Sequence, residues 1–254
     1  LVLTAASTGT IAGTACEVTF ALQNTATDQA SPTVSVAADI HGAIIGGSII
    51  SIGAIVEAAM AKLGSDLFGV VLGTDPLRVL VPLFGILSIE QSTPVSGATN
   101  TLTVTLTANY DLEVGSTVTI SGLTGSQTAN ASLNVTSTSG LLGTAGAWTK
   151  TSSTGQLVLT AASTGTIAGT ACEVTFALQN TATDQASPTV NVKADIHGQS
   201  GSIGAIAEAA MAKLATALYG VANGSAPLEV LVPSFGVKSI EQSTPVSGAT
   251  NTLT

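Results

Sequence analysis

The chain contains a long internal repeat, which constrains its fold more than any other feature. Residues 1–42 return as residues 157–198 with two differences, where Asn191 and Lys193 replace Ser35 and Ala37. Residues 51–63 return as residues 202–214 with one difference, and residues 88–103 return unchanged as residues 239–254. A period this long indicates repeated whole domains rather than a solenoid of short repeats.

The complete module predicted between residues 88 and 196 reads as a series of short strands. In residues 101–107 (TLTVTLT) leucine and valine alternate with threonine, which places the apolar side chains on one face of a strand. About seven such segments, separated by glycine-rich and proline-rich turns, are typical of a two-sheet sandwich. We therefore expect a mainly β protein built from immunoglobulin-like β-sandwich modules in tandem.

The repeat also predicts where the modules begin and end. We expect the closing part of one module, a connector, a complete module, a second connector that repeats the first, and the opening strands of the next module. These segments are residues 1–42, 43–87, 88–196, 197–238 and 239–254. Half a sandwich exposes unpaired strand edges, so strands in residues 1–36 and 239–254 should be completed by continuing chain or by a neighbouring subunit.

The second connector contains a segment whose secondary structure the sequence leaves open. Between Ser202 and Gly220 apolar residues recur at helical spacing, with a serine able to cap the first turn and a glycine able to stop the last. This pattern favours a short helix. Gly204 inside the segment keeps an extended connector as the alternative.

Charge is scarce in this chain, and this excludes some classes of function. Only 8% of the residues are charged, against about 25% in an average protein. The net charge of −9 and the six Lys and Arg residues argue against binding nucleic acid, which requires clustered cations. The most apolar runs are too short or too interrupted to span a bilayer. A surface with so little charge predicts a cover of glycans or of neighbouring subunits.

Several segments resemble a known family. The segments TLTVTLTANYDLEVGSTVTISGLTGS, GQLVLTAAS, CEVTFALQN and QASPTV resemble the repeated immunoglobulin-like modules of very large secreted proteins of microalgae and related protists. That family includes mastigoneme-like flagellar-hair proteins and cell-surface proteins. The resemblance implies the fold and an extracellular or cell-surface location, and it implies no activity.

Few residues have a type and spacing that suggest chemistry. Cys16 and Cys172 are the only cysteines, one per copy, and each shares the parity of apolar neighbours, so we expect both in the core with Trp148. An intermodule disulfide or reactive thiol remains the alternative. His41 and His197 also occur once per copy and are expected in turns. We predict no catalytic site, metal site or cofactor.

Three positions match the acceptor pattern for N-linked glycans. They are Asn130, Asn134 and Asn223, each followed two residues later by Ser or Thr. Glycans at one or more of them would explain how a surface poor in charge stays in solution.

The differences between the two copies predict an assembly interface. Copy one has leucines at three positions where copy two has Asn223, Ser234 and Lys238. These leucines are Leu72, Leu83 and Leu87. Because exposed leucines would form an adhesive patch, we expect them to be buried against a partner in the assembly, and Arg78 to pair with Glu229 of a neighbouring subunit.

Taken together, these features predict a structural subunit of an extracellular, glycosylated filament or surface coat. Its partners would be copies of itself in a homopolymer, joined between repeats or by donor strands of the pilus kind, in a helical assembly. The alternative is an adhesin or glycan-binding module that uses its loops. An enzyme finds no support in the sequence.

Overall fold

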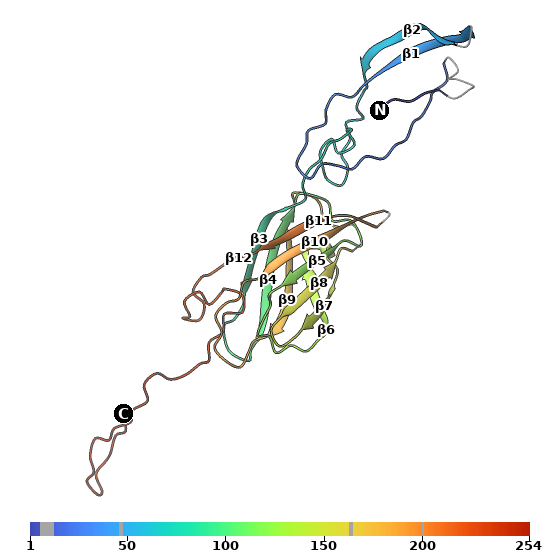
Figure 1. The fold of residues 1–254 in the computed structure, drawn as a ribbon. Helices are drawn as coiled ribbons and strands as arrows, with labels where there is room; N and C mark the ends of the chain where they lie inside the picture. The colour runs from blue at the N-terminus through green and yellow to red at the C-terminus, as the bar shows by residue number, and fades with distance from the viewer. Residues whose placement is uncertain (6–12, 46–47, 163–164, 200) are drawn as a thin grey trace. The chain divides into compact units, whose positions relative to one another are not determined.

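The computed structural model describes residues 1–5, 13–45, 48–162, 165–199 and 201–254, and the side chains of residues 43–49 are left out of the description (Figure 1). The chain forms two compact units. Unit 1 comprises residues 1–62 and 75–81, and unit 2 comprises residues 63–74 and 82–254.

Unit 2 is built on a 10-stranded sheet with the order β11-β10-β5-β8-β7-β6-β9-β4-β3-β12. Its strands are β3 (Phe84–Gln91), β4 (Thr99–Ala108), β5 (Thr117–Ser121), β6 (Ala131–Ser137), β7 (Ala145–Lys150), β8 (Gly155–Thr160), β9 (Cys172–Gln179), β10 (Asn191–Gly198), β11 (Gly201–Ala210) and β12 (Ala212–Lys213). All neighbours are antiparallel except β12 and β3, which are parallel.

Two strand segments change partners and fold this sheet into two layers. The first half of β6 pairs with β7, whereas Val135–Ser137 in its second half pair with β9. On the other side, β11 pairs with β10, and β12, which follows one residue later, pairs with β3. The same stretch of chain therefore lies at both ends of the strand order. The result is a mainly β fold with two sheets, consistent with a β-sandwich and nearly closed like a barrel.

Alternation along the strands builds the core between the layers. In β4 and β9 every second residue is buried. Val104 lies opposite Val174 and Leu102 lies opposite Phe176, so the two strands bury the same face. Trp148 is buried in the same core, and its indole N–H donates to the carbonyl of Thr128 at 3.1 Å.

The helix favoured for Ser202–Gly220 is wrong, and the extended alternative describes the chain. Residues 201–210 form β11, which pairs antiparallel with β10, with Gly201 opposite Gly198. As a strand, this segment forms its backbone hydrogen bonds with β10. The pairing also places Ile206 in the core. Thr138–Gly140, a single 3-10 turn, is the only helical element in the described parts of the chain.

Unit 1 contains a hairpin that repeats the β10–β11 hairpin. Strands β1 (Ser35–Ile45) and β2 (Ser48–Ala59) pair antiparallel, with Val36 opposite Ala58. In the second copy Val192 lies opposite Ala209, which is the equivalent register. The hairpin therefore forms from its own sequence in both copies, whatever surrounds it.

A buried polar cluster joins the first two strands of unit 2 to residues distant in sequence. The amide of Asn100 donates to Gln91 Oε1 at 2.7 Å and to Asn180 Oδ1 at 2.9 Å. The Gln91 side chain also accepts from the backbone N–H of Leu228 and donates to the carbonyls of Gly224 and Glu229. Gln91, Asn100 and Asn180 are all buried. Because each buried polar atom depends on the others, the cluster fixes the module's first strands on residues 224–229.

This cluster generates a test of stability with a control from the repeat itself. Asn100→Ala should lower the free energy of unfolding by about 3 kcal/mol, because it leaves buried partners unsatisfied. Asn251→Ala changes the identical sequence at an exposed position and should cost less than about 0.5 kcal/mol. Urea unfolding at dilute concentration measures both values. Equal losses in the two variants would contradict the role given to the cluster.

Candidate functional site

One sequence occurs in this chain in two different environments. Residues 172–179 form β9 in the core of unit 2, and the identical residues 16–23 lie in unit 1. Phe176 is 3% exposed and Leu178 is 1% exposed, whereas their counterparts Phe20 and Leu22 are 57% and 65% exposed. Burial of such side chains is worth about 1.5–3 kcal/mol each, so unit 1 leaves a large stabilising contribution unrealised.

The neighbouring strands explain this difference. In unit 2, β9 lies between β4 and β6 and is paired with both. In unit 1, residues 16–23 are assigned to no strand, and among the described residues no strand lies beside them. We call Val18, Phe20 and Leu22 the open face, because their counterparts form the inner face of β9.

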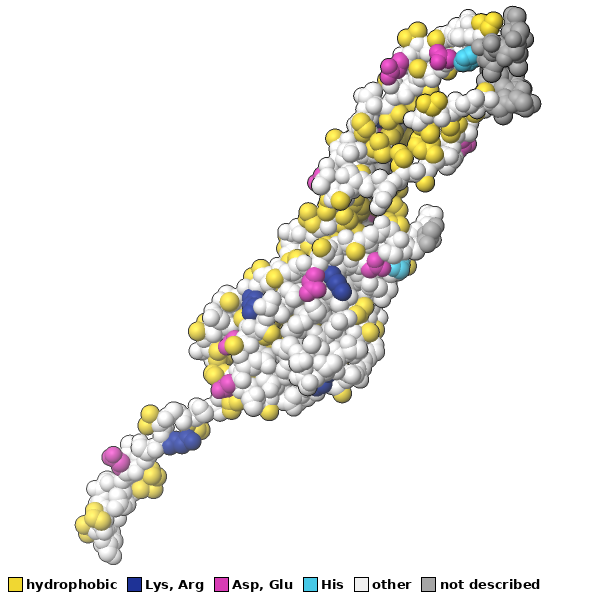
Figure 2. Space-filling model, in the orientation of Figure 1, with side chains coloured by type: hydrophobic (Ala, Val, Ile, Leu, Met, Phe, Trp, Pro, Cys, Tyr) yellow, Lys and Arg dark blue, Asp and Glu magenta, His cyan; other side chains and the backbone are white. Residues whose placement is uncertain are grey.

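Unit 1 exposes many large apolar side chains besides those of the open face. Figure 2 shows hydrophobic side chains gathered over the part of the chain that carries β1 and β2, whereas the surface of the sandwich is mostly white. The exposed apolar residues of unit 1 are Leu1, Val2, Leu3, Val18, Phe20, Leu22, Val36, Ile40, Ile50, Ile52, Ile55, Val56, Met60, Leu77 and Val81. A patch of this extent is characteristic of an interaction surface.

The two cysteines follow the same division. Cys172 is buried in β9, as expected, and burial raises the pKa of its thiol, partly offset by a hydrogen bond to the backbone at Thr138. Cys16 was expected in the core and is instead exposed, because no strand of unit 1 covers the segment that carries it. Both are free thiols.

A second segment is exposed at the other copy of the repeat. Residues 239–254, identical to residues 88–103, form a small hairpin in which Gln242 pairs with Leu253. We call this segment the 239–254 hairpin. Ile240 and Leu253 are exposed, whereas their counterparts Ile89 and Leu102 are fully buried in unit 2.

The interface residues predicted from the copy differences lie mostly at the surface of this single chain. Leu72 and Leu83 are exposed and Leu87 is partly buried against the core. Glu229 is paired within unit 2, where its Oε2 accepts from the backbone N–H of Ser187 at 2.7 Å. Arg78 has a buried Nε for which the described residues supply no acceptor. A pairing of Arg78 with Glu229 between subunits therefore stays a prediction.

The three glycosylation candidates are exposed. Asn130 precedes β6, and its side-chain oxygen accepts from the backbone N–H of Lys150. Asn134 lies within β6 opposite Ala145. Asn223 lies in a turn with a positive φ of 57°. All three side chains are accessible to a glycan.

His41 and His197 lie within strands β1 and β10 and not in turns as predicted, and His197 belongs to a small polar cluster in the β10–β11 hairpin. The hydroxyl of Ser202 donates to Asp195 Oδ1 at 2.7 Å, and His197 Nε2 lies 2.9 Å from Asp195 Oδ2. The hydroxyl therefore faces the carboxylate and not the imidazole, so the imidazole cannot activate it as a nucleophile in this geometry. The hydrogen bond from Ser202 is the main cause that lowers the pKa of Asp195, and His197 adds to it.

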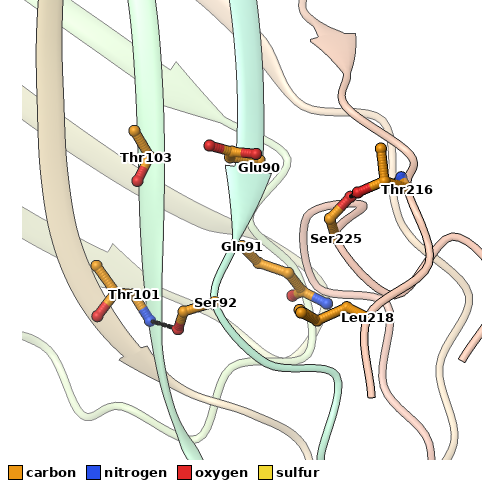
Figure 3. A pocket seen from close by; sticks show the side chains of 8 residues that line it. All are labelled: Glu90, Gln91, Ser92, Thr101, Thr103, Thr216, Leu218 and Ser225. Atoms are coloured by element: carbon orange, nitrogen blue, oxygen red, sulfur yellow. Dashed lines mark hydrogen bonds between the residues drawn. The ribbon is translucent and has the colours of Figure 1, made fainter. Parts of the chain in front are cut away.

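Figure 3 shows a shallow depression beside β3 and β4. Its lining residues are Glu90, Gln91, Ser92, Thr101, Thr103, Thr216, Leu218 and Ser225. They are mainly hydroxyl and amide side chains and include no aromatic ring on which a sugar could stack. In the part of the chain that the structure describes, no group of three or more His, Cys, Asp or Glu could hold a metal ion, and no helix could cross a membrane.

Gln91, Asn100 and Asn180 were not predicted from the sequence. Each also has an identical counterpart in the other copy (Gln242, Asn251 and Asn24), which is the one signal that marks them. Nothing in the spacing of these residues shows that they meet.

The thiols provide a direct measure of the two environments. The unmodified chain should have one thiol that reacts rapidly with Ellman's reagent, since Cys16 is exposed and Cys172 is buried with a raised pKa. Cys16→Ala should abolish the rapid phase and Cys172→Ala should leave it unchanged. Two rapid thiols per chain would show that β9 is not protected as described.

The Asp195 cluster predicts a dependence on pH. A carboxyl whose pKa is lowered by folding stabilises the folded state at neutral pH, and this contribution is lost as the pH falls through the folded pKa. Ser202→Ala should raise the pKa of Asp195 toward its ordinary value, measured by NMR titration of the carboxyl carbon. Ser51→Ala, at the equivalent position of copy one, is the matched control and should leave the Asp195 titration unchanged.

No protein-family model matches this chain, and none of the curated protein sequences matches it either.

Proposed function

We propose that this protein is a structural subunit of an extracellular, glycosylated filament or surface coat, assembled from immunoglobulin-like modules through strand completion between repeats or chains. The observation that carries the proposal is the contrast between the two copies. The same eight residues are core strand β9 in one copy and an exposed segment in the other. A segment whose sequence is suited to a core, yet which lacks its neighbours, is the starting point for donor-strand assembly.

The sparse charge supports the same proposal. A coat or filament buries its surface against other subunits or under glycans, so it does not need dispersed charge to stay in solution. The open face and the surrounding apolar residues of unit 1 supply the surface to be buried. Asn130, Asn134 and Asn223 supply exposed attachment points for glycans.

The immunoglobulin-like assignment rests on the way the strands divide between layers. One layer contains β3, β4, β9 and the end of β6, and the other contains β10, β5, β8 and β7. The chain crosses between the layers from β4 to β5, from β8 to β9 and from β9 to β10, as it does in Greek-key sandwiches. In this module β6, β7 and β8 form an additional meander between β5 and β9.

The second candidate function, a glycan-binding adhesin, has weaker support. The depression in Figure 3 offers hydroxyl and amide groups for hydrogen bonds to a sugar, without an aromatic platform.

We assign the Asp195 cluster to closing the β10–β11 hairpin rather than to catalysis, because the hydroxyl of Ser202 is bonded to the carboxylate of Asp195.

Imaging of native material tests the proposed function. Negative-stain microscopy of the source cells or their medium, with antibodies against this chain, should label filaments or a surface layer. Treatment with an endoglycosidase should reduce the mass of the native protein, and Asn→Gln changes at positions 130, 134 and 223 should remove that shift. Labelling of dispersed monomers without glycans would overturn the proposal, and specific binding on a glycan array would favour the adhesin.

A further inference from the structure

We propose that the 239–254 hairpin of one copy adds to residues 16–24 of a second copy, in the register that β4 adopts on β9. This inference rests on the proposed strand completion and specifies which segment completes which face. The partner is a second copy of this chain. Both surfaces are exposed in the described structure.

The two segments are identical in sequence to a pair of segments that lie side by side in unit 2. The chain already shows the two partner sequences paired, since residues 88–103 are identical to residues 239–254 and residues 172–180 are identical to residues 16–24. In unit 2, Thr99 lies opposite Gln179, Leu102 lies opposite Phe176 and Thr103 lies opposite Thr175. Transferred to the other copies, Thr250 would lie opposite Gln23, Leu253 opposite Phe20 and Thr254 opposite Thr19.

The apolar contact is the first contribution to this pairing. Leu102 and Phe176 bury each other on the inner face of β4 and β9, where they are 0% and 3% exposed. Leu253 and Phe20 are both mostly exposed in the described chain. Pairing of the two copies would remove both side chains from water together.

The polar cluster is the second contribution, and it fixes the register. In unit 2 the Asn180 amide donates to the carbonyls of Thr93 and Val95, and its oxygen accepts from Asn100. The equivalent groups are Asn24 in one copy and the carbonyls of Thr244 and Val246, with the amide of Asn251, in the other. A shift of one residue would bring these groups opposite apolar side chains, so the correct register is favoured over its neighbours.

The 239–254 hairpin is already shaped for this role. Asn251 Oδ1 accepts from the backbone N–H of Ser243 at 3.0 Å, and its amide donates to Gln242 Oε1 at 3.0 Å. In unit 2 the equivalent groups, Asn100 with Ser92 and Gln91, form the same bonds at 3.2 and 2.7 Å. The hairpin thus has the internal hydrogen bonds of its paired form before it meets a partner, which lowers the entropic cost of association.

Residues 250–254 of the hairpin are the counterparts of the first five residues of β4. A covalent trap measures directly whether they reach residues 16–24 of a second copy.

Disulfide trapping tests both the partner and the register. Thr101 and Ala177 are an exposed cross-strand pair, so their counterparts Thr252 and Ala21 should be close enough to form a disulfide. In a Cys16→Ala background, one chain carries Ala21→Cys and a second, isotope-labelled chain carries Thr252→Cys. The matched control combines Thr19→Cys with Thr250→Cys, which lie on the same segments and the same outward face but four residues out of register.

We expect the mixed disulfide between positions 21 and 252 to form several-fold faster than the one between positions 19 and 250. Mass spectrometry of the labelled and unlabelled peptides identifies the mixed species, and an excess of the free peptide 239–254 should slow its formation. Equal rates for the two pairs, or disulfides only between identical positions, would overturn the proposal.

A further pair of variants separates the pairing from general adhesion. Phe20→Ala should slow the in-register link several-fold, because Phe20 is the inner-face residue that Leu253 would cover. Thr19→Ala lies on the outer face and should leave the rate unchanged. Since Phe20 is exposed in the isolated chain, neither change should alter folding, which circular dichroism checks. Equal rates for both variants would also count against the pairing.

The outcomes separate this inference from the proposed function. If native material forms filaments but positions 21 and 252 do not form the in-register disulfide, the inference is wrong and the proposed structural function still stands. An in-register link from a protein that forms no filament or coat in its native setting would do the reverse.

Discussion

The pairing of β4 with β9 is the interaction on which the rest of the structure depends. These two strands place Leu102, Val104, Leu106, Val174 and Phe176 in the core, and they connect β3 to β6. Where both strands are present, the sequence CEVTFALQ becomes a core strand. Where the β4 counterpart does not lie beside it, the same sequence has no assigned strand and its apolar residues face solvent. The fold of this segment is therefore set by its neighbours and not by its own propensity.

Closure is the second constraint, and it concerns the edges of the sheet. A sandwich with open edges offers unpaired backbone groups to any other strand. In unit 2, β6 continues from one layer to the other, and residues 201–213 pair with an edge strand of each layer. Little edge is left available for nonspecific pairing. Residues 16–23 and the 239–254 hairpin are not covered in this way. Their unpaired backbone groups are exposed, and the repeat shows which segments pair with their counterparts in unit 2.

The sequence predicted the features that depend on local alternation. The strands rich in threonine and valine and the buried position of Cys172 follow from a two-residue period read along one strand, and the burial of Trp148 follows from the sandwich that those strands predict. The helix prediction for the segment from Ser202 failed because its pattern is ambiguous. Isoleucine and alanine at intervals of three and four also fit a strand that buries one residue, Ile206. Cys16 has the same local pattern as Cys172, and only the surrounding strands distinguish them. The Gln91, Asn100 and Asn180 cluster joins residues up to 89 positions apart, which no local pattern reports.

The buried polar cluster has a significance beyond stability. Apolar faces made of valine, leucine and phenylalanine would tolerate several registers, because any shift of two residues again brings apolar side chains together. Asn100 and Asn180 do not tolerate such a shift, since each is fully buried and would lose its hydrogen-bond partners. In a chain with so few charges, these amides replace salt bridges as the groups that select one pairing from many. A repeat protein with nearly identical modules has particular need of such selection, because every module offers its neighbours the same apolar surface. The amides thus serve a structural protein in the way that charged residues at an interface serve others: they contribute specificity, while the apolar residues supply the free energy.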